Sequence, residues 1–400
     1  MNDWSTLERT KRILVALITS FMPFHQAFAA PYQPGHDTQV LERLPSAASA
    51  LANLELRRLR NQLAANPDQI TLAVDLAERY VARGKAEADP RYYGYAEGLL
   101  KNWWQMPEPP PKVLLIRALI KQHRHDFDSA LEDLDKLLRR QPENAQGWLT
   151  RAMIQLVQAR YTDGLKSCAP LIEFGDTLLA ATCLAQANSL MGQAQKSYEF
   201  LLDAFTHQAE APAELRQWTL TVLADIAARL NKTIDAEKHF SEAAGIENTN
   251  VYLFVAYADF LLDQRQPQKV LALLQDKNRV DALFLRIVLA KKQMADHELD
   301  QAINELEARF AASRMRGENL HQGDEARFAL HLLNKPEDAL RLATANWQAQ
   351  REPKDARILL EAALAAQNAE AAKPVLDLLN TTKMEHPQLW QLAAQIEKLQ

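Results

Sequence analysis

The stretch HRHDFDSALEDLDKLLRRQPENAQGW, residues 123–148, carries the spacing that decides the fold. Small and apolar residues recur in it at helical intervals and are followed by a proline: Ala130, Leu134, Leu137 and Pro142. Alanine is small enough for two helices to approach closely, and the leucines fill the groove beside it. Proline has no amide hydrogen and clashes with the preceding turn, so it marks the end of a helix. The spacing predicts a helix that ends before Pro142 and a next unit that starts near Trp148.

This spacing resembles that of the tetratricopeptide repeat, in which two antiparallel helices share about 34 residues. Such a hairpin has apolar surface on two sides and cannot bury both alone, so neighbouring hairpins stack. The composition agrees with helical structure, because glycine supplies only 11 of 400 residues and long alternating β-branched runs are absent. The resemblance implies an all-α fold, a right-handed α-solenoid (superhelix) of stacked helix-turn-helix repeats.

The same register, carried along the chain, divides it into segments of uneven regularity. We expect a leading helix at 46–66, repeats over 67–280 that match best at 112–275, and degenerate repeats with a C-terminal capping helix over 281–400. The last part departs from the pattern because the helix expected within 297–317 is longer than the second helix of a standard repeat. Residues 30–45 are interpreted as a flexible N-terminal arm.

Residues 1–29 have the three parts of a secretory signal peptide. Basic residues up to Arg12 precede an apolar run of about twelve residues, and Ala27 and Ala29 form a small-residue cleavage site. An uncleaved membrane anchor is the alternative, but the run is shorter than the roughly twenty residues that span a bilayer. We therefore predict cleavage near Ala29 or Ala30, a periplasmic location, and no membrane insertion of the mature chain.

The chain has two cysteines, Cys168 and Cys183, placed symmetrically about a break in the helical pattern. Cys168 lies seven residues before Gly175, and Cys183 lies seven residues after Asp176. Residues equidistant from the turn of a helical hairpin lie at the same height, and an exported protein meets oxidising conditions. We predict a disulfide between two neighbouring repeats. Two buried free thiols are the alternative if the side chains diverge, and a redox enzyme is disfavoured because no C-x-x-C motif is present.

Other chemistry has weaker support in the sequence. His123, His125, Asp126 and Asp128 offer ligands for a divalent metal, but they fall in a turn between two helices, where polar residues and an Asp cap are expected. No nucleophile with its base and no phosphate loop is recognisable. The net charge of −5, with acids and bases interspersed, provides no basic face for nucleic acid. We expect no metal, no cofactor and no nucleic-acid partner.

The resemblance also implies where a partner would bind. In the tetratricopeptide family, set positions of the first helix of each repeat face a concave groove that takes polypeptide segments. Mapped onto this sequence, those positions give the following partner-binding candidates: Gln146, Met153, Trp218, Asp225, Arg229, Tyr252, Asp259 and Asp263. Leu149 and Leu156 belong to the same set, as do His321, Asp324 and His331 if the eighth register is correct. A cluster of lysines and arginines that clamps a C-terminal carboxylate in some family members is missing from this set.

These expectations combine into a function. The sequence favours an exported, non-enzymatic scaffold or adaptor that mediates protein-protein interactions in the bacterial periplasm by binding peptide segments in its groove. A scaffold for envelope polysaccharide export or cell-wall assembly is the alternative of the same class. A cell-wall enzyme with unrecognised catalytic residues is the alternative of another class. The identity of the partner and the oligomeric state stay open.

Overall fold

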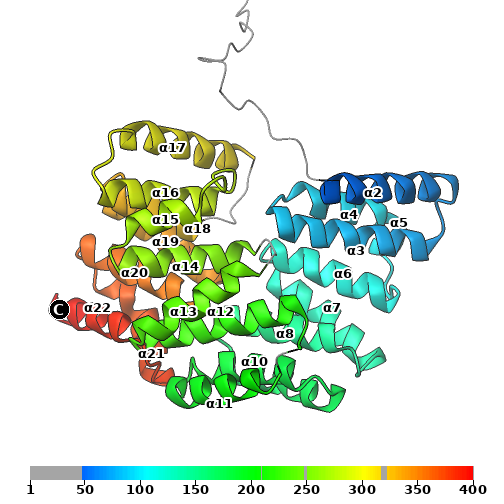
Figure 1. Cartoon of the computed structure of the whole chain (residues 1–400), viewed down its shortest axis with the longest axis horizontal. Helices are drawn as coiled ribbons and strands as arrows, with labels where there is room; N and C mark the ends of the chain where they lie inside the picture. Colours follow the sequence, from blue (N-terminus) through cyan, green and yellow to red (C-terminus); the bar gives the residue numbers. More distant parts are fainter. Residues whose placement is uncertain (1–46, 209, 247–249, 317–321, 400) are drawn as a thin grey trace, which may run out of the picture. The chain divides into compact units, whose positions relative to one another are not determined.

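The computed structural model describes residues 47–208, 210–246, 250–316 and 322–399. Every regular element in these ranges is a helix, as the all-α expectation requires (Figure 1). The chain divides into two units, Met1–Glu55 and Leu56–Gln400, and the hairpins belong to the second. The predicted signal peptide at 1–29 and the arm at 30–45 lie outside the described residues. Within the described ranges, no helix is both long enough and apolar enough to cross a membrane.

Consecutive helices pair into hairpins that stack along the chain. The leading helix is α2 (Ala47–Ala65), followed by α3 (Ile70–Glu87) with α4 (Arg91–Leu99) and the short α5 (Lys101–Trp104). The next pairs are α6 (Pro111–His123) with α7 (Phe127–Arg140), α8 (Ala145–Val157) with α9 (Tyr161–Cys168), and α10 (Thr177–Asn188) with α11 (Ala194–Thr206). They are followed by α12 (Ala213–Arg229) with α13 (Thr233–Gly245), α14 (Val251–Asp263) with α15 (Pro267–Leu273), and α16 (Asp281–Gln293) with α17 (Leu299–Met315). The last are α18 (Gln322–His331) with α19 (Pro336–Ala349), α20 (Pro353–Ala365) with α21 (Lys373–Thr382), and the terminal α22 (Pro387–Glu397).

The repeat is visible in the backbone of the hairpin turns. Each turn has one residue in the left-handed region, with φ between 50° and 70°: Ala88, His125, Ala159, Gly192, Asn231, Arg265, Ala295, Asn334 and Gln367. Successive members of this series are 30 to 39 residues apart, as the differences between their numbers show. In most of the turns the following amide donates to a carbonyl five residues earlier, for example Asp126 to Lys121 at 2.9 Å, which is a Schellman-type end of the first helix.

The same turn recurs where the sequence pattern is degenerate. Ala295, Asn334 and Gln367 all lie beyond residue 281, and their φ angles are 52°, 53° and 51°. The helix expected to be long is long, since α17 has 17 residues. The C-terminal part therefore keeps the hairpin geometry although its residue spacing departs from the family pattern.

The predicted core positions of the second hairpin are buried. Ala118 and Ala130, where the helices were expected to cross, are both fully buried, and so are Leu134 and Leu137. Helix α7 ends at Arg140, two residues before Pro142. The spacing in residues 123–148 therefore predicted both the packing and the end of this helix correctly.

The C-terminal hairpins pack against hairpins in the middle of the chain. One core cluster joins Leu156, Ala187 and Leu190 of the third and fourth hairpins to Ile358 of α20 and Leu389 of α22. The backbone takes part as well: the amide of Arg351 donates to the carbonyl of Val157 at 2.7 Å. The Glu385 carboxylate accepts the amide hydrogen of Ala194, although the two residues are 191 positions apart in sequence. The first helices of the middle hairpins are therefore covered by later parts of the same chain.

Candidate functional site

A cavity of about 740 Å³ lies between the middle hairpins and the C-terminal helices. The first helices of four successive hairpins, α8, α10, α12 and α14, supply one wall. Helices α20 and α22 supply much of the other wall, and Arg327 of α18 also reaches the cavity. The apolar part of the lining includes Met153, Leu156, Val157, Leu190, Val222, Val255, Phe260 and Ile358. Charged and amide side chains make up most of the remainder.

Most of the residues assigned to the binding surface from the sequence line this cavity. They are Met153, Asp225, Arg229, Tyr252, Asp259 and Asp263, with Leu156 from the wider set. Gln146 does not line it: this residue lies in the first turn of α8, and its side chain donates to Thr150 at 3.1 Å. Trp218 does not line it either, because its indole packs against the buried cluster around Cys168 and Cys183. His321 lies outside the described residues.

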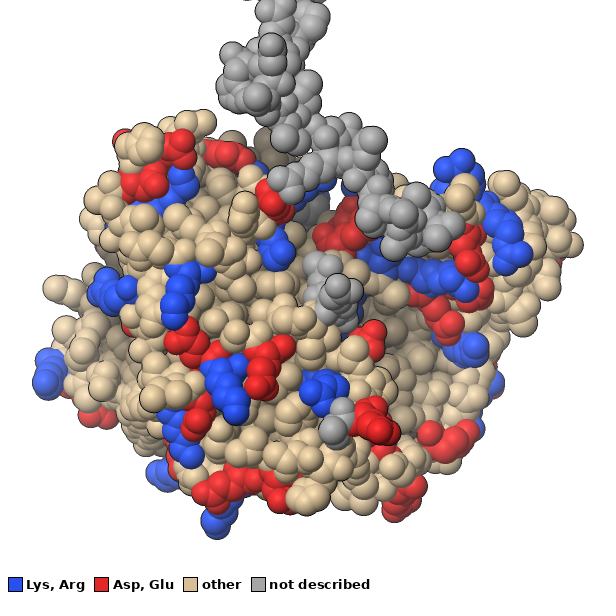
Figure 2. Space-filling model, in the orientation of Figure 1, with Lys and Arg blue, Asp and Glu red and all other residues tan. Residues whose placement is uncertain are grey.

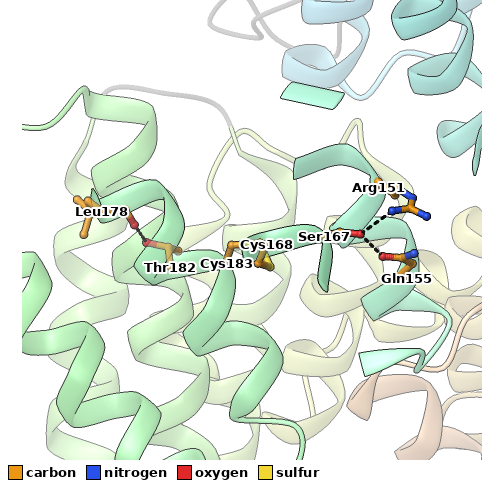
Figure 3. Close-up of a disulfide and its surroundings, with 7 residues drawn as sticks. All are labelled: Arg151, Gln155, Ser167, Cys168, Leu178, Thr182 and Cys183. Atoms are coloured by element: carbon orange, nitrogen blue, oxygen red, sulfur yellow. Dashed lines mark hydrogen bonds between the residues drawn. A yellow bond between two sulfur atoms is a disulfide. The ribbon is translucent and has the colours of Figure 1, made fainter. Parts of the chain in front are cut away.

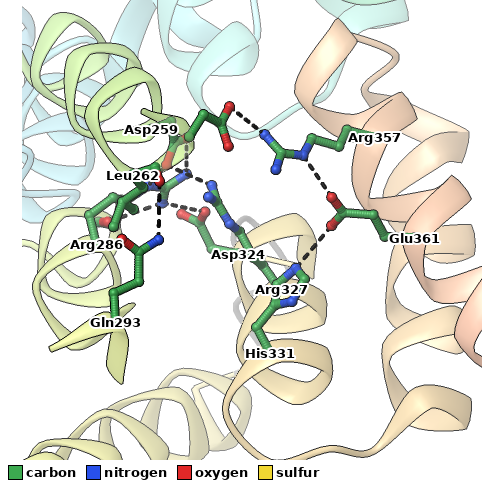
Figure 4. Close-up of polar contacts among 11 residues, drawn as sticks. Asp259, Leu262, Arg286, Gln293, Asp324, Arg327, His331, Arg357 and Glu361 are labelled. Carbon is green, nitrogen blue, oxygen red and sulfur yellow. Dashed lines mark hydrogen bonds and ion pairs between the residues drawn. The ribbon is translucent and has the colours of Figure 1, made fainter. Parts of the chain in front are cut away.

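Charge pairing holds Asp259 in place on the wall of the cavity. Arg286 donates to both oxygens of this carboxylate, at 3.0 and 2.9 Å, and Arg327 donates to one of them at 2.7 Å (Figure 4). Arg286 is almost completely buried and also reaches Asp324 at 2.5 Å. Burial alone would raise the pKa of Asp259, but the charges of Arg286 and Arg327 outweigh burial and hold that pKa well below its usual value. Asp259 is therefore an ionised, fully paired group.

A second set of charges ties α14 to α20. Arg357 of α20 donates to Asp263 at 2.7 Å and to Glu361 at 2.7 Å, and His331 lies 2.9 Å from the other oxygen of Glu361. Burial would raise the pKa of Glu361, but His331 and Arg357 lower it to about 2. Figure 4 shows this chain of contacts running from Arg357 through Glu361 to His331. Asp263, one of the predicted partner-binding residues, is thus paired with an arginine of the same chain.

Three of the predicted residues form a separate polar group on the cavity wall. The Tyr252 hydroxyl donates to Asp225 at 3.3 Å, and Tyr252, which lines the cavity, is 43% exposed. Arg229, one helical turn after Asp225, donates to the carbonyl and the hydroxyl of Ser189, both at 2.8 Å. Burial raises the pKa of Asp225 to about 6 although Arg229 opposes it, and burial lowers the pKa of Arg229. Both pKa shifts mean that burial disfavours the charged forms of Asp225 and Arg229.

No pattern in the sequence indicated the residues that complete the site. Arg327, Lys354, Arg357, Glu361 and His386 all come from the C-terminal part of the chain. Arg357 and Glu361 are four residues apart, a spacing typical of an ordinary exposed helix face. Asp263, the cavity residue that pairs with Arg357, is 94 positions earlier, and His331, which contacts Glu361, is 30 positions earlier, so no local pattern joins them. The basic residues that the mapped surface lacked are therefore supplied by α18 and α20.

The two cysteines are joined in a disulfide that links the end of α9 to α10. Their sulfur atoms are 2.01 Å apart, their Cα atoms are 5.6 Å apart, and both residues are fully buried (Figure 3). Cys168 ends α9, and Asp176 caps α10 by accepting the amide hydrogen of Leu179 at 3.0 Å. A short 3-10 helix, η1 (Ala169–Phe174), lies between them because Pro170 cannot continue the α-helical hydrogen bonds. The disulfide therefore links the third hairpin to the fourth.

The histidine and aspartate cluster of the second hairpin is part of a turn. His125 is its left-handed residue, and the ring of His123 stacks on Tyr93 with centroids 3.7 Å apart. Asp126 precedes α7, but its side chain makes no capping hydrogen bond, so that detail of the prediction was wrong. In the part of the chain that the structure describes, no three metal-ligating side chains gather at one place.

Comparisons with solved structures find matches at low sequence identity and with TM-scores below 0.5. No family model matches the chain, and no curated protein matches it. The human IFIT1 dimer with m7Gppp-AAAA is 13% identical, with a TM-score of 0.46, over 88% of this chain and 86% of that one. A tetratricopeptide repeat protein from Parabacteroides merdae is 15% identical, with a TM-score of 0.36, over 63% of this chain and 98% of that one. Yeast Tom70 is 11% identical, with a TM-score of 0.33, over 88% and 93% of the two chains. The stacked hairpins and their recurring turns are those of a tetratricopeptide-type fold.

Proposed function

We propose that the protein is an exported scaffold of the bacterial periplasm that holds other proteins by binding a short polypeptide segment in the cavity. One observation carries the proposal: six of the eight residues that the repeat register assigns to the binding surface line a single cavity. The register that gives these positions was set by the small and apolar core residues of the repeat.

The size and lining of the cavity support a short segment. Its volume of about 740 Å³ lies within the range of roughly 300–1,000 Å³ typical of sites for small ligands. Apolar side chains such as Val222 and Phe260 offer contact area, and a few polar groups are placed among them. Because α20 and α22 cover the first helices of the middle hairpins, a long extended chain has less room than in an open groove. We therefore expect a few residues of the partner to enter.

The charge pattern supports a polypeptide over a polyanion. The bases Arg327 and Arg357 in the cavity are already paired with carboxylates. On the face shown in Figure 2, acidic and basic side chains are interspersed without a continuous basic area. A protein that follows a phosphate backbone needs several basic groups that are not neutralised by its own acids.

Site-specific photo-crosslinking in living cells tests this function. A benzophenone amino acid replaces Val255, which lines the cavity, and in a control replaces Ile234, which is 86% exposed on α13. We expect crosslinks to a defined segment of another protein from position 255 and none of the same products from position 234. Equal products from both positions, or none from position 255, would contradict peptide binding in the cavity.

Export is tested separately. Cell fractionation and the intact mass of the purified protein report the compartment and the start of the mature chain. We expect periplasmic protein that lacks residues 1–29 or 1–30. Full-length protein in the cytoplasmic fraction would refute export while leaving the cavity assignment unaffected.

A further inference from the structure

One acid and one base in the cavity differ from all their charged neighbours. The other ionised side chains of its lining are in ion pairs: Asp259 with Arg327, Asp263 and Glu361 with Arg357, and Glu352 with Lys354. Asp225 and Arg229 are the exceptions. Among the described residues, neither has an oppositely charged group within the ion-pair distance of 4.0 Å, although they are one turn apart on α12.

The reason is visible in the contacts of Arg229. Its two terminal nitrogens are both held by Ser189, one by the backbone carbonyl and one by the hydroxyl, so the guanidinium is directed to α10's end and not to Asp225. A guanidinium has five hydrogen-bond donors, so donors are left after these two bonds. Asp225 accepts one bond of 3.3 Å from Tyr252, which leaves most of its acceptor capacity unused. Both charged groups thus line the cavity with bonding capacity to spare.

We infer that Asp225 and Arg229 bind the two free ends of a short uncapped peptide, with the ammonium group at Asp225 and the carboxylate at Arg229. The inference goes beyond the proposed function, because its ligand is a free peptide and not a segment of a larger protein. It explains why opposite charges four residues apart are kept from pairing with each other. A ligand that carries both charges would neutralise both groups at once.

The dimensions agree with a peptide of two or three residues. Side chains four residues apart on a helix have Cβ atoms about 5–6 Å apart, and each can extend further. An extended chain advances about 3.3–3.6 Å per residue, so only a peptide of a few residues has its two ends close enough together for side chains one helical turn apart. Its side chains would contact the apolar lining near Leu156, Val222 and Val255.

The direction of both pKa shifts supports the same conclusion. The pKa of Asp225 is raised and that of Arg229 is lowered, both by burial, whereas pairing lowers the pKa of Asp259 and Glu361. Groups whose charged forms are disfavoured in the empty site gain most from a ligand of opposite charge.

Binding of defined peptides to the mature protein tests the inference. The probes are Leu-Leu-Leu, its N-acetyl form, its C-terminal amide and the doubly capped form, measured by calorimetry. A mixture of uncapped tripeptides built from Ala, Val, Leu and Phe, read by native mass spectrometry, covers other side chains. We expect uncapped tripeptides to bind and each cap to weaken binding about tenfold or more, because each cap removes a charge-assisted contact.

Matched variants assign each end. In Asp225→Asn, N-acetylation should have no further effect while C-amidation still weakens binding, and in Arg229→Gln the pattern should be reversed. Asp203→Asn, at an exposed position of α11, is the control and should bind as the wild type does. Circular dichroism establishes that each variant is folded.

The outcomes separate this inference from the proposed function. Equal binding of capped and uncapped peptides overturns the inference and leaves a cavity that takes internal segments, as the function requires. Absence of binding by every tripeptide also overturns it, and crosslinks from position 255 would then still report whether the cavity holds a protein segment.

Discussion

Gly192, in the turn of the fourth hairpin, lies directly against the carbonyl oxygen of Lys383 at the end of α21. A Cβ atom at Gly192 would come within 3.0 Å of that oxygen and 3.3 Å of the Cβ atom of Lys383. Both residues have left-handed backbones, with φ of 70° and 53°. This contact is one of the places where the C-terminal hairpins meet the middle of the chain. It lies close in sequence to the hydrogen bond from the amide of Ala194 to the carboxylate of Glu385.

Substitution of Gly192 by alanine should therefore weaken the packing of the end of α21 against the fourth hairpin. The new methyl group meets a backbone carbonyl, and alanine disfavours a positive φ, which alone costs about 1–2 kcal/mol. We expect the free energy of unfolding in urea to fall by about 2–3 kcal/mol, the steric contact adding to the backbone cost.

Gly175→Ala is the matched control for this change. Gly175 also has a positive φ, 82°, but nothing lies within 4 Å of a Cβ atom built there. The Gly175→Ala variant should therefore lose only the part of the free energy of unfolding that comes from placing alanine at a positive φ. If the two alanine variants lose equal stability, the approach of Lys383 to Gly192 does not constrain the fold.

The buried arginine between two carboxylates should be the most sensitive charge in the network. Arg286 is 2% exposed and pairs with both Asp259 and Asp324. Arg286→Met therefore removes a positive charge that balances these two carboxylates, which have little contact with water. We expect a loss of roughly 3 kcal/mol in the free energy of unfolding. Adding Asp259→Asn to the variant should restore part of it, because the uncompensated charge is removed.

A surface pair of the same chain shows whether burial is the cause. Lys269 and Glu237 form an ion pair whose side chains are 54% and 31% exposed. Lys269→Met should change stability by less than about 1 kcal/mol. A similar loss in both variants would mean that burial of Arg286 adds nothing.

Features that depend on near neighbours in the sequence could be predicted. Ala130 and Leu137 follow a spacing that fixes one face of one helix, and Pro142 ends that helix for a local steric reason. The pairing of Cys168 with Cys183 needed only the position of one turn. In a stack of hairpins each repeat contacts its neighbours, so such local signals decide most of the packing.

The cavity could be predicted only in part, because its second wall comes from far along the chain. Each hairpin is rotated slightly relative to the one before it, and these rotations add up before α20 comes to lie near α14. The total rotation depends on many residues, so no single sequence pattern predicts it. Arg357 is 94 positions from Asp263, so their pairing left no pattern. The register also assigned Gln146 and Trp218 to the surface, yet the cavity lies mostly beside the later turns of α8 and α12, where Met153, Asp225 and Arg229 are.

Reduction of the disulfide should destabilise the protein. The two cysteines are 15 residues apart, and closing a loop of that size stabilises a folded chain by about 3 kcal/mol in the chain-entropy model. We expect urea unfolding of the wild type to shift to lower concentration with a reductant, and unfolding of the Cys168→Ala, Cys183→Ala double variant to be unaffected by it. Two free thiols per chain in the denatured, unreduced protein would show that the bond does not form.

The elevated pKa of Asp225 predicts a dependence of stability on pH with a definite sign. Its pKa in the folded protein is about 6, above the value of 3.8 for the free side chain, because burial disfavours the carboxylate. Between these two values the folded state binds more protons than the unfolded state, so this group's contribution to stability falls as pH rises from about 4 to about 6.

The Asp225→Asn variant has no ionisable group at this position, so its stability does not show this decrease. The difference in free energy of unfolding between the variant and the wild type should therefore increase by about 1–2 kcal/mol in favour of the variant from pH 4 to pH 7. Urea unfolding at both pH values measures this difference, and Asp203→Asn controls for the loss of one negative charge. A difference that stays constant across this range would show that the carboxylate of Asp225 ionises in the folded protein as easily as in water.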